Sequence, residues 1–191
     1  MQQSDNFYRQ AILQLQAGRF AEAQDSLRKA LDANPVNLKA RQTLVGLLVE
    51  GKHDDEAMTQ LQEGLKLMPE QSGFCMALAR LQVEAGNATG AMDTLEKGLK
   101  YAGDDADYHA FYAALLQREE RHDEAIAHYL IALKSNPSAP VWLVGIAISL
   151  QAQGKLADAG EAYRRARDTG QLTPQMLQFV EQRLKQSKPL H

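Results

Sequence analysis

The sequence predicts an all-α solenoid, built as a stack of helix pairs, on two observations. Alanines recur at a fixed interval of 34 residues, at Ala23, Ala57, Ala91, Ala125 and Ala159. A strict period of this length is typical of a helix–turn–helix repeat, in which each unit packs on its neighbours. Helix formers dominate the composition, β-branched residues are few, and aromatic residues make up only 6% of the chain.

Each repeat is expected to hold two antiparallel helices. In the first repeat, Phe7, Ala11 and Leu15 recur at helical spacing, and Gly18 provides the turn before the second helix. Pro35 ends the second helix because proline has no amide hydrogen to donate. The same plan predicts a single domain over residues 1–191, with repeats at 4–37, 38–71, 72–105, 106–139 and 140–173.

A further helix is expected after the fifth repeat, over residues 174–187. It begins with Pro174 in its first turn, a position that proline tolerates. Leu177, Val180 and Leu184 share one face, and the residues between them are polar. This pattern predicts a capping helix, which covers the last repeat with its apolar face and meets water with the other.

Charge and composition exclude several classes of function. The chain of 191 residues has a net charge of −3, so it has no general attraction for nucleic acid. Residues 140–191 carry an excess of basic residues, an asymmetry more typical of a solvated surface. Cys75 is the only cysteine, which excludes an intramolecular disulfide and a cysteine zinc cluster. No run of about 18 apolar residues occurs, so we expect no direct membrane insertion by this chain.

No motif for catalysis, metal binding or cofactor binding is found, and we expect neither an enzyme nor a cofactor. Glycine-rich phosphate loops and zinc-protease or serine-hydrolase motifs are absent. His122 and His128 are six residues apart, a poor spacing for two metal ligands on one helix face. Solvated positions, or a helix pair between Glu124 and His128, are favoured instead. Cys75 is expected to be a small buried hydrophobic residue.

The repeat pattern resembles the tetratricopeptide repeat (TPR) family. Its signature is a small residue at repeat positions 8, 20 and 27, with large apolar residues beside them. Position 8 is occupied by Ala11, Val45, Ala79, Ala113 and Ala147, and position 27 by Ala30, Gly64, Gly98, Ala132 and Ala166. Small residues let two helices approach, and the large neighbours fill the grooves. The resemblance implies a right-handed TPR α-solenoid of five repeats and a capping helix.

The resemblance also implies a binding surface, because the first helices of a TPR stack line its concave face. We expect a protein or peptide partner on this face, since several of its side chains are apolar. Alternatively, the final helix covers Val144 and Ile148. The residues that the family pattern places on the concave face include Tyr8, Ile12, Leu15, Lys39, Gln42, Val49, Met76, Arg80, Val83, Asp107, Gln117, Arg118, Val144, Ile148 and Gln151.

A closer resemblance covers four segments of the second half, residues 108–117, 121–126, 140–150 and 179–184. They are similar to the TPR region of MshN-like proteins of mannose-sensitive haemagglutinin (MSHA) type IV pilus biogenesis. In that family a membrane helix precedes a periplasmic TPR domain. The resemblance implies a bacterial scaffold for pilus assembly or a related secretion apparatus, as the periplasmic domain of a parent anchored in the inner membrane.

Three alternatives remain open at this point. The chain could be a cytoplasmic TPR adaptor that binds a peptide or helix of a partner, or a regulatory subunit of an enzyme. A second copy of the chain is a further candidate partner, because the first helix lacks an N-terminal cap. An upstream hydrophobic segment of about 20 residues in the parent gene would favour the membrane-anchored form over the cytoplasmic one.

Overall fold

The computed structural model describes residues 2–186, and it contains eleven α-helices and no strand in that range. The expected all-α fold class is therefore confirmed. Residue 187, the last of the expected capping helix, lies outside the described residues. The helices are α1 (Gln2–Gln16), α2 (Phe20–Ala33), α3 (Leu38–Glu50), α4 (Asp54–Leu67), α5 (Ser72–Glu84), α6 (Ala88–Ala102), α7 (Ala106–Arg118), α8 (His122–Ser135), α9 (Pro140–Ala152), α10 (Leu156–Asp168) and α11 (Pro174–Gln186).

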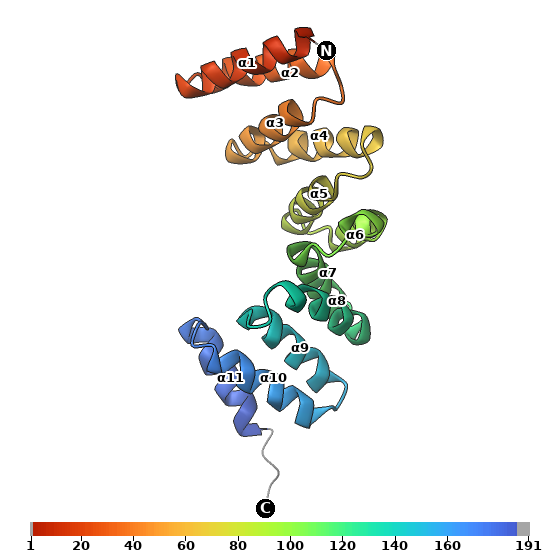
Figure 1. Cartoon of the computed structure of the whole chain (residues 1–191), viewed down its shortest axis with the longest axis vertical. Helices are drawn as coiled ribbons and strands as arrows, with labels where there is room; N and C mark the ends of the chain where they lie inside the picture. Colours follow the sequence, from red (N-terminus) through yellow and green to blue (C-terminus); the bar gives the residue numbers. More distant parts are fainter. Residues whose placement is uncertain (1, 187–191) are drawn as a thin grey trace, which may run out of the picture. The chain divides into compact units, whose positions relative to one another are not determined.

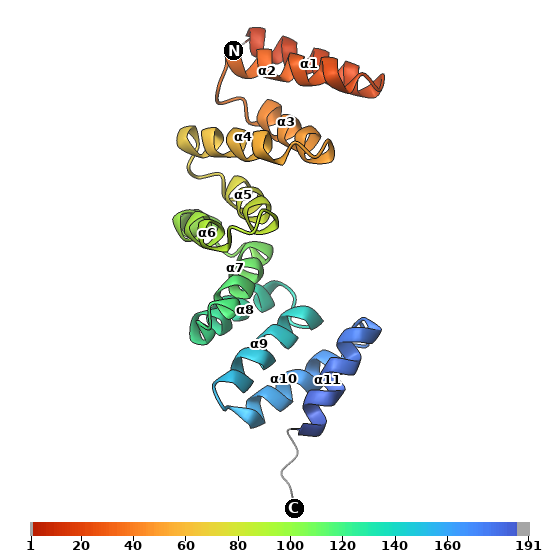
Figure 2. The same ribbon diagram turned by 180° about the vertical axis from the view of Figure 1, so that it is seen from behind.

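The chain divides into two compact units, unit 1 over residues 1–101 and unit 2 over residues 102–191. In unit 1, α1 packs on α2, α2 on α3, α3 on α4 and α4 on α5 (Figures 1 and 2). In unit 2, α7 packs on α8, α8 on α9, α9 on α10 and α10 on α11. Within each unit, neighbours in sequence are thus neighbours in space. The single domain over residues 1–191 stays a prediction.

The 34-residue alanines lie where helices approach one another. All five, Ala23, Ala57, Ala91, Ala125 and Ala159, have no exposed surface. The large residue four positions later is also buried, as Leu27, Leu61, Leu95, Tyr129 and Tyr163. A methyl side chain allows the helix backbones to come close, and the larger neighbour then fills the groove beside it.

The last helix, α11, has the features expected of a cap. The Thr173 hydroxyl accepts a hydrogen bond from the Met176 amide at 3.3 Å, which satisfies one free donor at the start of the helix. Val180 is fully buried, and the Phe179 ring meets the Tyr163 ring of α10 edge to face at 6.2 Å. The helix therefore covers α10 with one side.

The turn between the two helices of a repeat contains a residue in the left-handed conformation. In repeats one, three and five this residue is glycine, at Gly18, Gly86 and Gly154. In repeat two it is Lys52, with φ of 61°, and in repeat four it is Glu120, with φ of 59°. The neighbouring Gly51 has φ of −79° and does not take this place. A side chain with a Cβ is strained there, so the two turns lower the stability of the fold.

We predict that Lys52→Gly stabilises the protein by about 0.5–1 kcal/mol. It relieves a left-handed strain of roughly 1–2 kcal/mol and loses part of that gain to the greater freedom of unfolded glycine. Lys29→Gly is the matched control, because Lys29 is exposed within α2. That change should destabilise by about 1 kcal/mol. Urea unfolding of both variants checks the sign, and equal destabilisation would contradict the assigned strain.

Gly145 on α9 fits the aromatic ring that repeat four carries in place of leucine. A Cβ at Gly145 would clash with the ring of Tyr129, most closely at its Cζ atom. Tyr129 is only 5% exposed, and burial raises the pKa of its phenol to about 12. The equivalent residues of the first three repeats are leucines. The position of the Tyr129 ring therefore depends on the absence of a side chain at Gly145.

We predict that Gly145→Ala destabilises by about 1–3 kcal/mol, because the buried ring has little room to move. Combining it with Tyr129→Leu should cost less than the sum of the two single changes, since the shorter side chain removes the clash. Thermal unfolding of the two single variants and the double variant measures the coupling. Additive losses would show that the ring and the glycine are not coupled.

Candidate functional site

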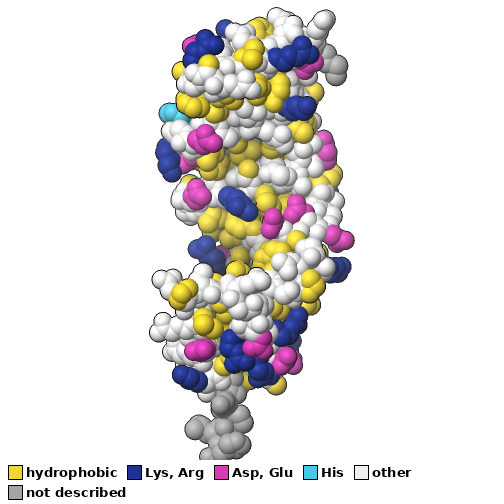
Figure 3. All heavy atoms as spheres, turned by 60° about the vertical axis from the view of Figure 1, so that its left-hand side comes forward, with side chains coloured by type: hydrophobic (Ala, Val, Ile, Leu, Met, Phe, Trp, Pro, Cys, Tyr) yellow, Lys and Arg dark blue, Asp and Glu magenta, His cyan; other side chains and the backbone are white. Residues whose placement is uncertain are grey.

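The first helices of unit 1 carry accessible side chains at every position expected to face a partner. Tyr8, Ile12, Leu15, Met76 and Val83 are half-buried, and Lys39, Gln42, Val49 and Arg80 are exposed. We call these nine residues the first-helix face of unit 1. Figure 3 shows hydrophobic side chains exposed between charged ones over the part of unit 1 formed by α3 and α5. The face therefore offers both apolar contact and charge, and its role in binding stays a prediction.

The first helices of unit 2 agree less well with the expected surface. Asp107 and Arg118 are exposed, and Ile148 is half-buried. Val144 is only 5% exposed, so its assignment to a partner surface is wrong. Five consecutive residues of α9, 143–147, are buried, because α9 packs against α7, α8 and α10. A helix enclosed in this way has no free apolar face at its centre.

Two polar residues of the expected surface in unit 2 join helices to one another. The Gln117 amide on α7 donates to the Gly145 carbonyl at 2.7 Å and to the Ser149 hydroxyl at 2.7 Å. The Gln151 carbonyl accepts from the Tyr163 hydroxyl at 3.0 Å. Both side chains thus satisfy buried or half-buried groups of neighbouring helices, and a partner would have to compete for them.

In repeat two, the residue at position 4 is the centre of a group of polar contacts that joins neighbouring helices, which we call a polar junction. Arg41 on α3 is 3% exposed. Its guanidinium donates to the Pro35 carbonyl at 3.0 Å and to the side-chain and backbone oxygens of Gln60, both at 2.9 Å. It also reaches Glu63 at 3.4 Å. The charge is buried with partners on most sides, which ties α3 to α4 and to the chain before α3.

The same junction recurs two repeats later with histidines. His109 Nε2 lies 2.8 Å from the Gly103 carbonyl oxygen, and His109 Nδ1 lies 2.8 Å from Nδ1 of His128. The two rings stack with centroids 5.0 Å apart, and the Tyr112 ring meets His128 edge to face. These residues correspond to Pro35, Arg41 and Gln60 of repeat two, because Gly103, His109 and His128 lie 68 residues, or two repeats, after them. The chemistry differs, but the contacts are the same.

The contacts fix the tautomers of the pair. A carbonyl oxygen only accepts, so His109 Nε2 carries hydrogen and His109 Nδ1 is left as an acceptor. We therefore assign the hydrogen between the rings to Nδ1 of His128. The sequence had favoured a Glu124–His128 helix pair or solvated positions. His128 is instead half-buried and bonded to His109 on the facing helix, a contact that comparing Arg41 and Gln60 across repeats could have suggested.

The environment holds His128 in its neutral form. Burial lowers the pKa of His128 below its ordinary value of 6.5, and the nearby His109 lowers it further. Glu124 acts in the opposite direction, and Arg121 adds to the lowering. Because the unfolded chain takes up the proton first, this site should lose stability as the pH falls below about 6.5.

We predict that His128→Gln reduces the acid sensitivity of unfolding. Glutamine is the equivalent residue in repeat two, and its amide can donate to His109 Nδ1 without titrating. The melting temperature of the unaltered protein should fall more than that of the variant between about pH 7.5 and pH 5.5. Parallel profiles would contradict the depressed pKa.

Residues 2–186 have neither a metal-binding cluster nor a membrane-spanning helix. In that range no cluster of three or more His, Cys, Asp or Glu side chains is arranged to hold a metal ion. None of the helices described there is long and apolar enough to cross a membrane.

Comparison with known families agrees with the helix pairs described above. Tetratricopeptide repeat models match residues 14–71, 55–115 and 115–176. The chain therefore belongs to the tetratricopeptide repeat family. Members of this family are generally non-enzymatic scaffolds for protein–protein interaction. No curated protein matches the sequence significantly.

Several solved structures share the fold at low sequence identity. A MamA crystal structure has a TM-score of 0.73 at 17% identity, with 99% of this chain and 98% of that chain covered. A second MamA structure, MamA AMB-1 in form C2221, has a TM-score of 0.69 at 21% identity, with coverages of 88% and 99%. YrrB, described as a TPR protein with an unusual peptide-binding site, has a TM-score of 0.76 at 16% identity, with coverages of 92% and 90%. These likenesses show the fold.

Proposed function

We propose that the chain is a scaffold that binds a peptide or helix of a partner protein on the first-helix face of unit 1. The observation that carries the proposal is the accessibility of Met76, Val83 and Ile12 on helices whose other faces form the core. Apolar side chains at the surface favour contact with another protein, and the neighbouring Lys39 and Arg80 supply charge that orients it.

The fold comparison supports this class of function without naming a ligand. YrrB has the same architecture and a peptide-binding site. At 16% identity its site residues do not carry over to this chain, so the binding face here rests on the accessibility of its own residues.

We predict that Met76→Glu combined with Val83→Glu abolishes partner binding and leaves helicity and melting nearly unchanged. The two changes place negative charge on a half-buried apolar surface that faces a partner. Leu67→Glu with Leu130→Glu is the control, because both leucines are exposed on second helices, at 49% and 54%. A collapse of the melting temperature in the first double variant would show that its residues belong to the core.

The finer proposal is a role in assembly of an MSHA-like type IV pilus or a related secretion apparatus, in the periplasm. It is supported by the sequence resemblance over residues 108–117, 121–126, 140–150 and 179–184. The alternatives are a cytoplasmic TPR adaptor and a regulatory subunit of an enzyme, and a second copy of the chain is a further candidate partner.

A pull-down from periplasmic and cytoplasmic bacterial extracts separates these possibilities. The unaltered chain is the bait, Met76→Glu with Val83→Glu is the control bait, and mass spectrometry identifies the captured proteins. Pilus or secretion components captured only by the unaltered chain would support the finer proposal and the binding face together. Cytoplasmic proteins alone would overturn the pilus role, and equal capture by both baits would overturn the face. Light scattering of the purified chain tests self-association.

A further inference from the structure

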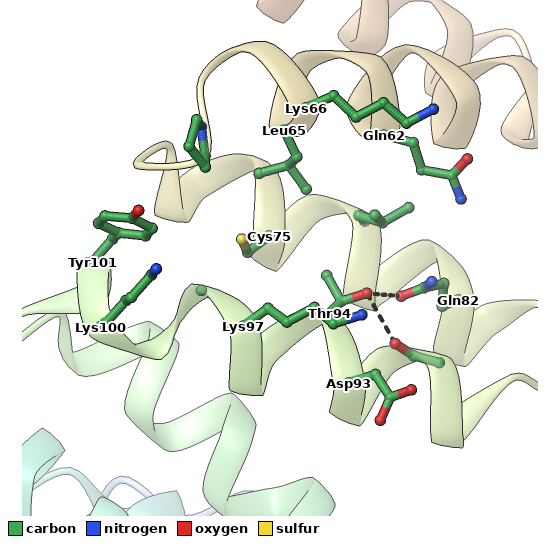
Figure 4. A pocket seen from close by; sticks show the side chains of 14 residues that line it. Gln62, Leu65, Lys66, Cys75, Gln82, Asp93, Thr94, Lys97, Lys100 and Tyr101 are labelled. Carbon is green, nitrogen blue, oxygen red and sulfur yellow. Dashed lines mark hydrogen bonds between the residues drawn. The ribbon is translucent and has the colours of Figure 1, made fainter.

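A pocket opens in unit 1 between the second helices α4 and α6, with α5 as its floor. Its volume is about 560 Å³, within the range of sites that hold a small ligand or a few residues of a peptide. Figure 4 shows Cys75 at its centre, with side chains of α4 on one side and of α6 on the other. Leu65 and Leu78 contribute further apolar surface.

The uncharged floor of the pocket follows from the small residue at position 4 of repeat three. Arg41 fills this place in repeat two and His109 fills it in repeat four, each reaching across to a carbonyl and to the facing helix. Repeat three has Cys75 at this position. Pro69 and Thr94 are equivalent to the residues that Arg41 and His109 contact in their own repeats. All three line the pocket. The equivalent groove of repeat two is also open, with a volume of about 720 Å³, but there the Arg41 side chain lines it. In repeat three a small, uncharged side chain takes that place.

The rim of the pocket is basic. Its lining includes Lys66, Lys97 and Lys100, against one acidic residue, Asp93. All three lysines are exposed, and none forms an ion pair with a residue in the described range 2–186. The Lys100 ammonium lies 4.8 Å from the ring centroid of Tyr101, which it covers. A chain with a net charge of −3 thus carries a local positive site over an apolar floor.

One amide of the pocket is also directed by its neighbours. The Gln82 carbonyl oxygen accepts a hydrogen bond from the Thr94 hydroxyl at 2.9 Å (Figure 4). This contact leaves the Gln82 amide hydrogens free of any partner among the described residues. The amide N–H groups of Gln82 can donate a hydrogen bond to the carbonyl of a peptide backbone. Neither the lysines nor the apolar floor would select a peptide backbone on their own.

We propose that this pocket binds an acidic peptide segment of a partner protein, with an aliphatic or aromatic side chain inserted over Cys75. The carboxylates of the segment contact Lys66, Lys97 and Lys100, and the Gln82 amide donates to its backbone. The pocket lies on a different face of α5 from Met76 and Val83, because Cys75, Leu78 and Gln82 recur at spacings of three and four residues. It is a second site, independent of the proposed first-helix face.

The test uses fluorescein-labelled hexapeptides and fluorescence polarisation with the full chain. The probe is Glu-Asp-Leu-Phe-Asp-Glu, compared with Glu-Asp-Gly-Gly-Asp-Glu and Lys-Lys-Leu-Phe-Lys-Lys. The acidic probe with the apolar centre should bind at least tenfold more tightly than either comparison peptide. Equal binding of the glycine peptide would overturn the apolar anchor, and equal binding of the lysine peptide would overturn the charge complementarity.

Two double variants test whether the acidic probe binds at this pocket. Lys97→Glu with Lys100→Glu should weaken the acidic probe at least tenfold. Lys29→Glu with Lys134→Glu should leave it unchanged, because these exposed lysines hold the same two repeat positions in repeats one and four. Equal losses in the two double variants would overturn the site.

A third variant, Cys75→Phe, fills the pocket with the residue that Phe7 provides at the same position of repeat one. Binding of the probe should be lost while circular dichroism stays that of the folded chain, and if the variant unfolds, the lysine pair decides the outcome. Binding of decanoate without binding of any peptide would overturn the peptide as the ligand. Met76→Glu with Val83→Glu should leave the probe unaffected, which separates this proposal from the proposed function.

Discussion

The close approach of helices at the 34-residue alanines is the constraint on which the rest of the structure depends. With no side chain larger than a methyl group at these five crossings, the helices of each repeat pack tightly, and none of the five methyl groups is exposed. Once this spacing is set, every other repeat position has a fixed neighbour. In repeats two to four, position 4 of the first helix lies near position 23 of its own second helix and near the end of the previous repeat. The chemistry of these junctions can then vary from one repeat to the next without changing the fold.

Position 4 shows how far that variation goes. Arg41 and His109 both build a hydrogen-bonded junction, one with a guanidinium and one with a pair of imidazoles. The arginine junction is strong only because several acceptors surround it, since a buried charge without partners is costly. In the histidine junction, burial lowers the pKa of His128, and so its protonation couples the junction to pH. Cys75 builds no such junction, and burial raises the pKa of its thiol. Repeat three thus has a small, uncharged side chain at the floor of its pocket, where repeat two has a guanidinium.

The sequence predicted the parts of the fold that repeat and missed the parts that do not. The alanine period, the helix pairs and the capping helix follow from spacing and turn residues, which act locally. The burial of Val144 could not be read from its family position, because it results from three other helices enclosing α9. The left-handed conformation of Lys52 was not expected from the sequence, because glycine adopts this conformation more readily and Gly51 is the adjacent residue. Cys75 was correctly expected to be buried, but the pocket that it lines also depends on side chains of two other helices, which its repeat position alone does not reveal.

The two proposed sites follow from a general property of helices in such a stack. A first helix must bury one stripe of side chains, which leaves two flanks whose sequence the fold does not dictate. On α5 one flank carries Met76 and Val83, and the other borders the pocket over Cys75. Because the two flanks share no side chain, a substitution on one removes no side-chain contact of the other. A single helix can therefore serve two partners at once, which is the property that a scaffold needs.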